Sequence, residues 1–454
     1  MNGLIQWLEK HVVPIATKIG SVRWLIALRD AFISTMPATM AGSVAVLLNA
    51  FLRDIPTQYG WTGFVKAMQP VVGVNSQVWT GTLAVIGLIF AFTWGYNLAK
   101  QYDVEPLTGG IVTLGTFLMS VSQTFTITLT KALPKAAEKI LTASGAAVDG
   151  KTVTGWGYFN FNAHFGAAGL FTAMILGGLA GAIYIILTKR NITIKMPESV
   201  PPAISKAFAG IIPAIVAWYV IGIITYVFTD ATGTAIIDWI GKTIQTPLLS
   251  LSQGYGAVLL LTILVQVFWF FGIHGTNVLG PVLDSIWLTA QLANVNAAAK
   301  GDALPYLWTR SDFDMYAWLG GAGSTLLLLI AIFVFSRRDD ERTVAKLAIA
   351  PGIFNINEPT MFGLPIVLNP IYVIPFILAP VVMVTVAYFA INWHLVAPVS
   401  IQMTWVMPPF LNSFLATSLD WRAPVLQLVN AVIGFIIYAP FVIASNKLDP
   451  EKLA

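Results

Sequence analysis

The segment 350–370, APGIFNINEPTMFGLPIVLNP, has the residue types and spacing best suited to chemistry. It lies in an apolar chain, yet it contains three Asn, one Glu and four Pro. Pro359 disfavours the helical conformation for the residue before it, so the backbone around Glu358 should be irregular. Irregular backbone at membrane depth is tolerated only where it is buried in protein or lines a wet cavity, and a carboxylate there is a functional-site candidate. We therefore predict that Glu358 is catalytic and binds substrate. The alternative is a structural carboxylate that caps a re-entrant helix.

Two amides flank this carboxylate. Asn355 and Asn357 offer donors and acceptors beside Glu358, and we predict that both bind substrate. Turn formation in a broken segment explains the same two residues about as well.

A second candidate site is the sequence WFFGIHGTNV around His274. Glycines on both sides of the histidine, including Gly275, allow a close backbone approach or a broken helix. We predict that His274 is catalytic and contacts substrate together with Trp269 and Gly275. The alternative is a packed, hydrogen-bonded intramembrane histidine.

Aromatic faces pair with the apolar C–H faces of sugars, so Trp269 and Trp405 are candidate stacking residues. Trp405 lies in the segment 400–421, which mixes Trp, Pro and amide residues between two apolar stretches. The chain has 15 Trp, and most tryptophans in a membrane protein belong to interface belts, which is the competing interpretation for each one.

Composition defines the class of protein. The chain has 454 residues, of which 57% are hydrophobic and only 10% charged, whereas soluble proteins carry about 25% charged residues. A polytopic membrane protein fits these values, and the net charge of +4 gives no reason to expect nucleic-acid binding.

There is no Cys, no GxxxxGK[ST] phosphate loop and no HExxH motif, and there are only four His. We therefore expect no metal site and no cofactor.

Hydrophobic runs long enough to cross a bilayer predict an all-α integral membrane protein with about ten transmembrane helices. The seventh predicted span contains Pro281 and Asp284. The spans are predicted at 30–52, 78–99, 106–124, 166–188, 207–229, 255–273, 277–296, 315–336, 371–391 and 424–446. Four basic clusters separated by even numbers of spans place both termini in the cytoplasm. The lysines of 131–164 lie in a predicted external loop and run against this rule.

The unusual polar residues gather in the C-terminal half of the chain. We predict an N-terminal membrane domain, 1–230, for scaffolding and dimerisation, and a C-terminal sugar-binding domain, 231–454, with two re-entrant segments at 350–370 and 400–421. We predict that residues 1–20 form an amphipathic interfacial helix anchored by Trp7, and that they are not a signal peptide.

The motifs GIHG at 272–275, NINEPTMFGLPIVLNP at 355–370 and SVPPAISKAFAGIIP at 199–213 resemble the membrane component, enzyme IIC, of bacterial sugar phosphotransferase systems. The most similar branch is the lactose/cellobiose/diacetylchitobiose family, and the resemblance covers nearly the whole chain. It implies a homodimeric, multi-pass protein of the bacterial plasma membrane. It also implies that His274 and Glu358 contact the sugar hydroxyl that becomes phosphorylated, with Asn357 beside them and Trp405 stacking.

In that family the phosphoryl donor is a phosphocysteine on enzyme IIB. Because this chain has no Cys and ends soon after its last span, we expect IIB to be a separate partner protein. The predicted function is therefore the sugar permease of a phosphoenolpyruvate-dependent phosphotransferase system, acting on a β-linked disaccharide of the cellobiose, chitobiose or lactose type. The chain would take part in phosphoryl transfer only together with enzyme IIB. The alternatives are a proton-coupled secondary sugar transporter and a non-transporting sugar sensor.

Overall fold

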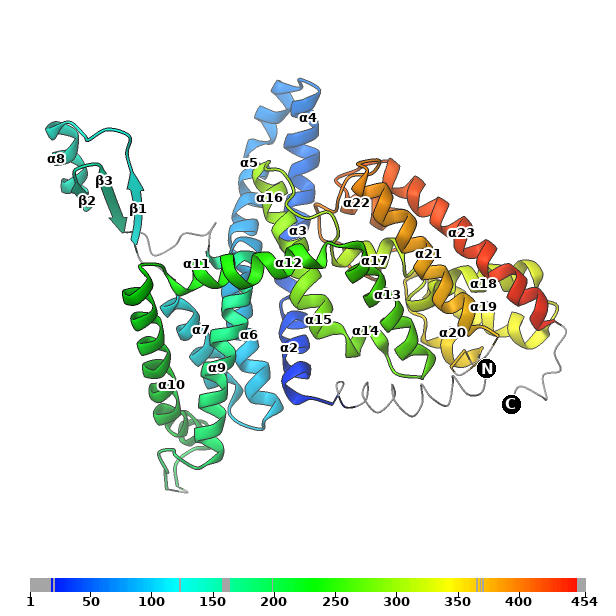
Figure 1. Ribbon diagram of the computed structural model, residues 1–454, viewed down its shortest axis with the longest axis horizontal. Helices are drawn as coiled ribbons and strands as arrows, with labels where there is room; N and C mark the ends of the chain where they lie inside the picture. The colour runs from blue at the N-terminus through cyan, green and yellow to red at the C-terminus, as the bar shows by residue number, and fades with distance from the viewer. Residues whose placement is uncertain are drawn as a thin grey trace. The chain divides into compact units, whose positions relative to one another are not determined.

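The computed structural model describes residues 18, 21–121, 124–156, 164–197, 199–364, 366–367, 369 and 371–446. Most of these residues are helical (Figure 1). The predicted interfacial helix with Trp7, and His11, lie outside the described residues.

The chain folds into two compact units. Unit 1 comprises Met1–Leu83 and Thr246–Ala454, and unit 2 comprises Ala84–Gln245, so unit 2 is inserted into unit 1. The chain passes between them at two places. The first crossing lies in the 3-10 helix η2 (Leu83–Val85), and the second follows the π-helix η5 (Gly241–Gln245).

Unit 1 begins with a run of helices that are mostly apolar. Their bounds are α2 (Arg23–Ser34), α3 (Met36–Asn49), η1 (Ala50–Asp54), α4 (Ile55–Gln58) and α5 (Thr62–Thr80). Helix α3 packs against α5. The buried amide of Asn75 donates to Asn49 Oδ1 over 2.9 Å, which satisfies two polar groups that would be costly to bury alone.

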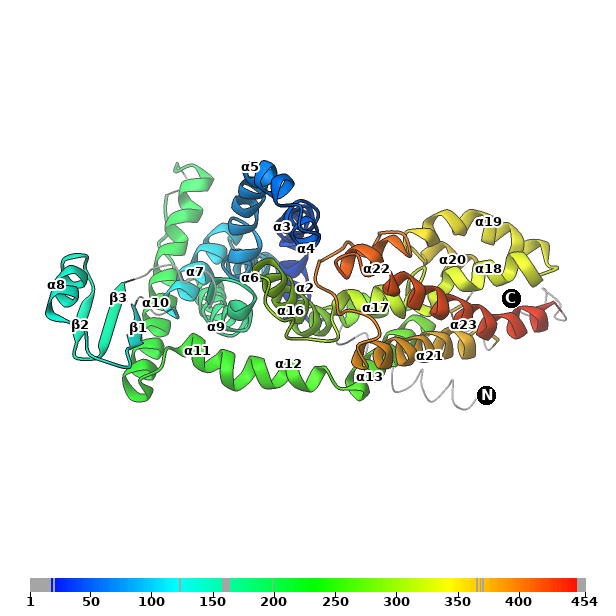
Figure 2. The ribbon, with the colours of Figure 1, turned by 90° about the horizontal axis from the view of Figure 1, so that it is seen from above.

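The rest of unit 1 has a broken first part and a second part in which short helices alternate with longer ones. The broken part consists of α12 (Thr246–Ser252), α13 (Tyr255–Phe270), α14 (Gly275–Val278), α15 (Gly280–Leu283), η6 (Asp284–Leu288), α16 (Thr289–Lys300) and α17 (Arg310–Tyr316). The remainder consists of η7 (Ala322–Ser324), α18 (Thr325–Phe335), α19 (Asp339–Ile353), α20 (Glu358–Gly363), α21 (Val373–Asn392), α22 (Leu411–Ala416) and α23 (Arg422–Ser445). Helices α21 and α23 lie side by side, with α13 packed on α21 and α18 on α23 (Figures 1 and 2).

A buried carboxylate joins several helix ends in unit 1. Glu341, near the start of α19, accepts hydrogen bonds from Ser336 Oγ (2.6 Å), Tyr372 OH (2.8 Å) and Ser445 Oγ (3.3 Å). These partners flank α18, α21 and α23, so one side chain fixes the start of the helix that leads to Glu358. Beside it, the hydrogen bond from Arg338 lowers the pKa of the Asp340 carboxyl.

Unit 2 is built on four closely packed helices. They are α6 (Ile86–Gln101), α7 (Pro106–Met119), α9 (Leu170–Lys189), which follows η4 (Ala167–Gly169), and α10 (Pro202–Thr232). A Cβ on Gly95 would lie 2.3 Å from the carbonyl oxygen of Gly109, so glycine is what lets α6 and α7 approach closely. The unit ends with α11 (Ile236–Ile240) and η5. His164 Nε2 lies 2.9 Å from Asp238 Oδ1, which ties α11 to the segment before α9.

The predicted all-α class needs a correction in unit 2. The sequence predicts helical spans up to residue 124 and a loop at 131–164, but between Thr124 and Trp156 the structure has a three-stranded antiparallel sheet, in the order β1 (Thr124–Thr128), β3 (Thr152–Trp156), β2 (Ala147–Asp149). Helix α8 (Lys135–Ala143) lies between β1 and β2 in the chain (Figure 1). Gly150, with φ of +57°, is the first of the two residues in the β2–β3 turn, between the paired residues Asp149 and Thr152, where a positive φ favours glycine.

Among the described residues, six helices are long and apolar enough to cross a membrane, and a seventh is obtained if the bent pair Ile236–Ser252 and Tyr255–Phe270 counts as one span. The expectation of a multi-pass helical protein is confirmed at this level. Several predicted spans are broken or shortened: 277–296 is divided among α14, α15, η6 and α16, and 315–336 contains α18 only from Thr325 onward. The count of ten and the two re-entrant segments stay predictions.

Candidate functional site

Unit 1 contains a cavity of about 490 Å3. Six of the seven residues predicted from sequence line it, namely Trp269, His274, Asn355, Asn357, Glu358 and Trp405. They come from three separate parts of the sequence, and in each part the backbone departs from regular helix. The cavity volume lies within the range typical of small-molecule sites.

His274 is positioned by the break between α13 and α14. It is the N-cap residue of α14, and its Nδ1 accepts a hydrogen bond from the backbone N–H of Asn277 (3.2 Å). Because Nδ1 is an acceptor, the neutral imidazole carries its proton on Nε2. The structure therefore orients the N–H of the ring toward the cavity side that holds Glu358.

Glu358 is the first residue of α20, directly after the irregular turn at Phe354–Asn357. Its Oε1 lies 3.5 Å from His274 Nε2, and the side chains remain 46% and 36% exposed, respectively. A carboxylate and an imidazole at this separation can share a proton or both contact one hydroxyl group. Both side chains are exposed enough to contact a ligand in the cavity.

The break before His274 depends on glycine. Gly272 has φ of +74°, a conformation that favours glycine, and Gly275 has no room for a side chain. A Cβ on Gly275 would lie 2.2 Å from the carbonyl oxygen of Val265 in α13. Gly275 does not line the cavity, so its position supports the backbone of the histidine turn.

The two asparagines brace the turn that carries Glu358. Asn355 has φ of +61°; its Oδ1 accepts from Gly320 N (2.8 Å) and its Nδ2 donates to the carbonyl oxygen of Trp405 (2.7 Å). Asn357 Nδ2 donates to the carbonyl oxygen of Ala322 (3.1 Å). Asn355 therefore connects three chain segments at the cavity, which is a positioning role.

The two tryptophans differ in accessibility. Trp269 is only 2% exposed and its ring packs on His274, with centroids 4.3 Å apart. Trp405 is 46% exposed and lies in the irregular segment before α22. Of these two residues, Trp405 has the face that a ligand can reach.

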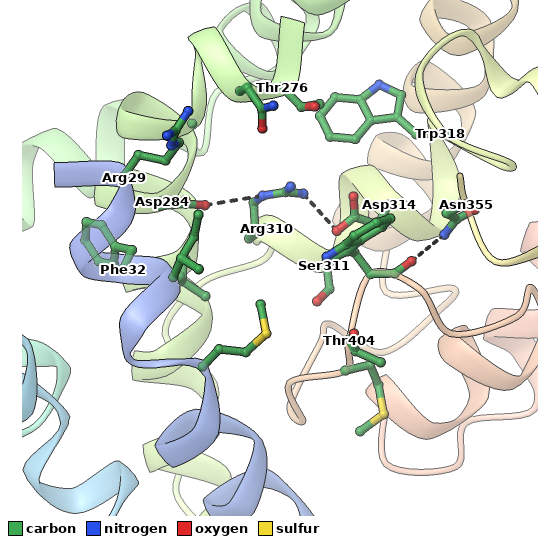
Figure 3. Close-up of a pocket in the computed structure, with 18 of the residues that line it drawn as sticks. Arg29, Phe32, Thr276, Asp284, Arg310, Ser311, Asp314, Trp318, Asn355 and Thr404 are labelled. Atoms are coloured by element: carbon green, nitrogen blue, oxygen red, sulfur yellow. Dashed lines mark hydrogen bonds and ion pairs between the residues drawn. The ribbon is translucent and has the colours of Figure 1, made fainter. Parts of the chain in front are cut away.

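The same cavity contains an ion cluster that the sequence analysis did not assign to the site. Arg310 NH1 donates to Asp314 Oδ2 over 2.8 Å, and Arg310 Nε lies 3.6 Å from Asp284 Oδ1 (Figure 3). The guanidinium carbon also lies 5.4 Å from the ring centroid of Trp318. The signal was the run WTRSDFDMYAW at 308–318, where charged residues alternate between tryptophans at the edge of a predicted span.

Helix α17, which carries Arg310 and Asp314, is fixed at its start by a capping box. The Thr309 backbone N–H and hydroxyl both donate to Asp312 Oδ2, at 2.7 Å each. In addition, Gln291 exchanges two hydrogen bonds of 2.8 Å with Ser311. Capping residues of this kind define where a short helix begins, and so they set the position of both charged side chains.

Comparison with known proteins gives a consistent result. The family model for "Phosphotransferase system, EIIC" matches residues 29–380. The cellobiose-specific EIIC component of Lactococcus lactis subsp. lactis (strain IL1403) is 44% identical over the whole of both chains. The oligo-beta-mannoside-specific EIIC component of Bacillus subtilis (strain 168) is 36% identical, over 99% of this chain and 96% of that protein.

A solved structure is similar over nearly the same length. The crystal structure of the transporter ChbC, the IIC component from the N,N'-diacetylchitobiose-specific phosphotransferase system, matches with a TM-score of 0.86 and 34% identity, covering 97% of this chain and 98% of that one. Membrane-type helices and a polar cavity among broken helices define a membrane transport component. The chain belongs to the EIIC family of the phosphotransferase system, as the motifs had indicated.

Proposed function

We propose that this chain binds a β-linked disaccharide of the cellobiose type and carries it across the bacterial plasma membrane for phosphorylation by enzyme IIB. The observation that carries the proposal is the exposed pair His274–Glu358 in a cavity of about 490 Å3, in a chain of the EIIC family. The full-length similarity to a cellobiose-specific EIIC component makes cellobiose the first sugar to test.

The proposed chemistry assigns separate roles to the two residues. The sugar O6 attacks the phosphorus of a phosphocysteine on IIB, the P–S bond breaks, and the thiolate leaves with IIB. Glu358 accepts the O6 proton, and His274 orients the hydroxyl through its Nε2–H. The product is the sugar 6-phosphate. Trp405 stacks on the sugar, while Trp269, Asn355, Asn357 and Gly275 complete or brace the site.

The proposal includes an arrangement in the membrane. About ten spans, two re-entrant segments at 350–370 and 400–421, and cytoplasmic termini fit the basic clusters in the sequence. We also propose a homodimer, in which residues 1–230 provide scaffold and dimer contacts and residues 231–454 bind the sugar. A dimer is tested by measuring the mass of the purified protein in detergent.

The decisive experiment compares energy sources in membrane vesicles. Vesicles supplied with phosphoenolpyruvate, the general phosphoryl carriers and IIB should accumulate cellobiose as its phosphate. Vesicles without IIB should accumulate almost none. Accumulation of unmodified cellobiose driven by a proton gradient alone would overturn the proposal.

A proton-coupled secondary transporter is the alternative, and one observation favours it. An imidazole and a carboxylate 3.5 Å apart are the groups that a proton relay uses. The same vesicles decide between the two, because only the alternative predicts uptake that collapses with a protonophore and needs no IIB.

A further inference from the structure

The ion cluster Asp284–Arg310–Asp314 is unusual for a short helix. Arg310 is the first residue of α17 and Asp314 lies one turn further on. A cation at a helix N-terminus opposes the helix dipole, and an ion pair with the basic residue first is the less favourable order. Helix stability therefore does not explain why an arginine occupies this position.

The cluster is also largely removed from solvent. The side chains of Asp284 and Arg310 are each 19% exposed, and that of Asp314 is 17% exposed. Ion pairs at this depth lose much of their hydration, and replacing them by apolar groups is often no less stable. All three nevertheless line the cavity, so what accessible surface they keep faces a bound ligand.

Charge in this part of the cavity does not balance. Arg29 also lines the cavity, and its Nε and NH2 groups both bond to Asp30 Oδ1, at 3.0 and 2.8 Å. The charged residues that line the cavity are three carboxylates (Asp284, Asp314 and Glu358) and two guanidinium groups (Arg29 and Arg310), which leave a net charge of −1 while His274 is neutral.

We propose that the cluster Asp284–Arg310–Asp314 selects neutral sugars, by binding the hydroxyl groups of the disaccharide ring that is not phosphorylated and by rejecting anionic sugars. The inference rests on the proposed function and deepens it. Carboxylate oxygens accept from sugar hydroxyls, and the guanidinium has five N–H donors, of which its protein partners use only part. Trp318 lies against the guanidinium and keeps it in place.

Rejection of anions follows from the same geometry. A carboxylate on the sugar would enter a cavity whose lining carries a net negative charge, and placing like charges side by side is unfavourable. A neutral disaccharide meets no such repulsion, and its hydroxyl groups replace the water lost by the cluster. Cellobionate, whose reducing-end residue is oxidised to an open-chain carboxylate, and cellobiitol, whose reducing-end residue is reduced to a neutral open-chain alcohol, differ only at this one carbon and form a matched pair of probes.

The test measures the affinity of purified full-length protein for cellobiose, cellobiitol, cellobionate and glucose, in wild type, Asp314→Asn and Asp312→Asn. We expect wild type to prefer cellobiitol over cellobionate by at least about tenfold, the ratio that corresponds to 1.4 kcal/mol. Asp314→Asn should weaken cellobiose binding and narrow that preference several-fold, with little effect on glucose. Arg310 keeps Asp284 as a partner in this variant, so no cation is left without a counter-ion.

Asp312→Asn is the matched control. Asp312 lies on the same helix but is fully buried, does not line the cavity and serves the capping box. Asn keeps an oxygen that can accept from Thr309, so α17 and its charged side chains should stay in place; thermal stability should fall and the cellobiitol-to-cellobionate ratio should stay unchanged. If both variants change the ratio equally, the effect is loss of α17 and the proposal is overturned.

Other outcomes separate the two proposals. An unchanged ratio in Asp314→Asn overturns the selectivity alone, while a wild-type chain that binds no sugar of the panel overturns the proposed function and the selectivity together. If Asp314→Asn does not fold, Asp284→Asn poses the same question, because Arg310 then keeps its bond to Asp314.

Discussion

His274 Nε2 lies 3.5 Å from Glu358 Oε1, although the two residues come from breaks between different pairs of helices, α13–α14 and α19–α20. Each break exposes a polar side chain that an unbroken apolar helix would have to bury or turn to lipid. The hydrogen bond from Asn277 N to His274 Nδ1 determines which ring nitrogen faces the carboxylate. Two helix breaks thus produce one acid–base pair.

Replacing Glu358 by Gln tests the base. Gln keeps hydrogen-bonding groups but cannot accept the O6 proton at neutral pH, so IIB-dependent phosphorylation of cellobiose should be abolished. Binding should weaken by roughly 1.5–3 kcal/mol, the value of a hydrogen bond to a charged group. Calorimetric titration and a phosphorylation assay measure the two effects separately. Normal sugar-phosphate formation in this variant would remove the general-base role.

His274→Asn separates the cap from the chemistry. Asn is a good N-cap residue and should preserve the start of α14, but it has no atom equivalent to Nε2. Phosphorylation should fall strongly while the unfolding temperature stays near that of wild type. His274→Ala, which loses the cap as well, should cost about 1 kcal/mol more in stability. If Asn and wild type phosphorylate sugar equally, the imidazole has only a structural role.

Gly275→Ala tests the close contact between α13 and α14. Its Cβ would lie 2.2 Å from Val265 O, so the backbone must shift, at a cost of about 1–3 kcal/mol. Thermal unfolding in detergent should show lower stability, together with weaker sugar binding because His274 moves. Gly256→Ala on α13 is the control, since nothing lies within 4 Å of its Cβ position. Equal stability of both variants would contradict this prediction.

Trp405→Ala tests the stacking face. Loss of the exposed indole should reduce cellobiose affinity by about tenfold, in line with about 1.4 kcal/mol of aromatic contact. Trp393, which is 66% exposed at the end of α21 and lies outside the cavity lining, provides the control. Trp393→Ala should bind cellobiose like wild type. Similar losses in both variants would point to a general effect of removing tryptophan.

Much of the site could be predicted from the sequence because polar residues in an apolar chain are conspicuous. Glu358 and His274 stand out against their surroundings, and Pro359, Gly272 and Gly275 mark backbone breaks. Not every proline marks a break: Pro351 lies inside the last turn of α19 and does not interrupt it. A proline near a helix end can be accommodated where neighbouring groups satisfy the freed carbonyl.

The ion cluster and the small sheet could not be found by the same reasoning. Arg310 and Asp314 lie where a membrane span was expected to begin, and charged residues are common at the ends of spans. Asp284 belongs to a different segment of the chain, and only the folded structure brings it next to Arg310. Strands β1 and β3 are Thr-rich and far apart in the sequence; they pair directly with each other, and β2 joins β3 through a hairpin. The strands themselves do have a sequence signal, because Thr124–Thr128 (TFTIT) alternates polar and apolar residues with a period of two, but this pattern does not say which strands pair.

The two crossings between the units have a consequence for proteolysis. Because unit 2 is an insertion, both of its ends are joined to unit 1, one at Leu83–Val85 and one after Gly241–Gln245. A single proteolytic cut at either crossing would therefore leave the two units covalently linked through the other.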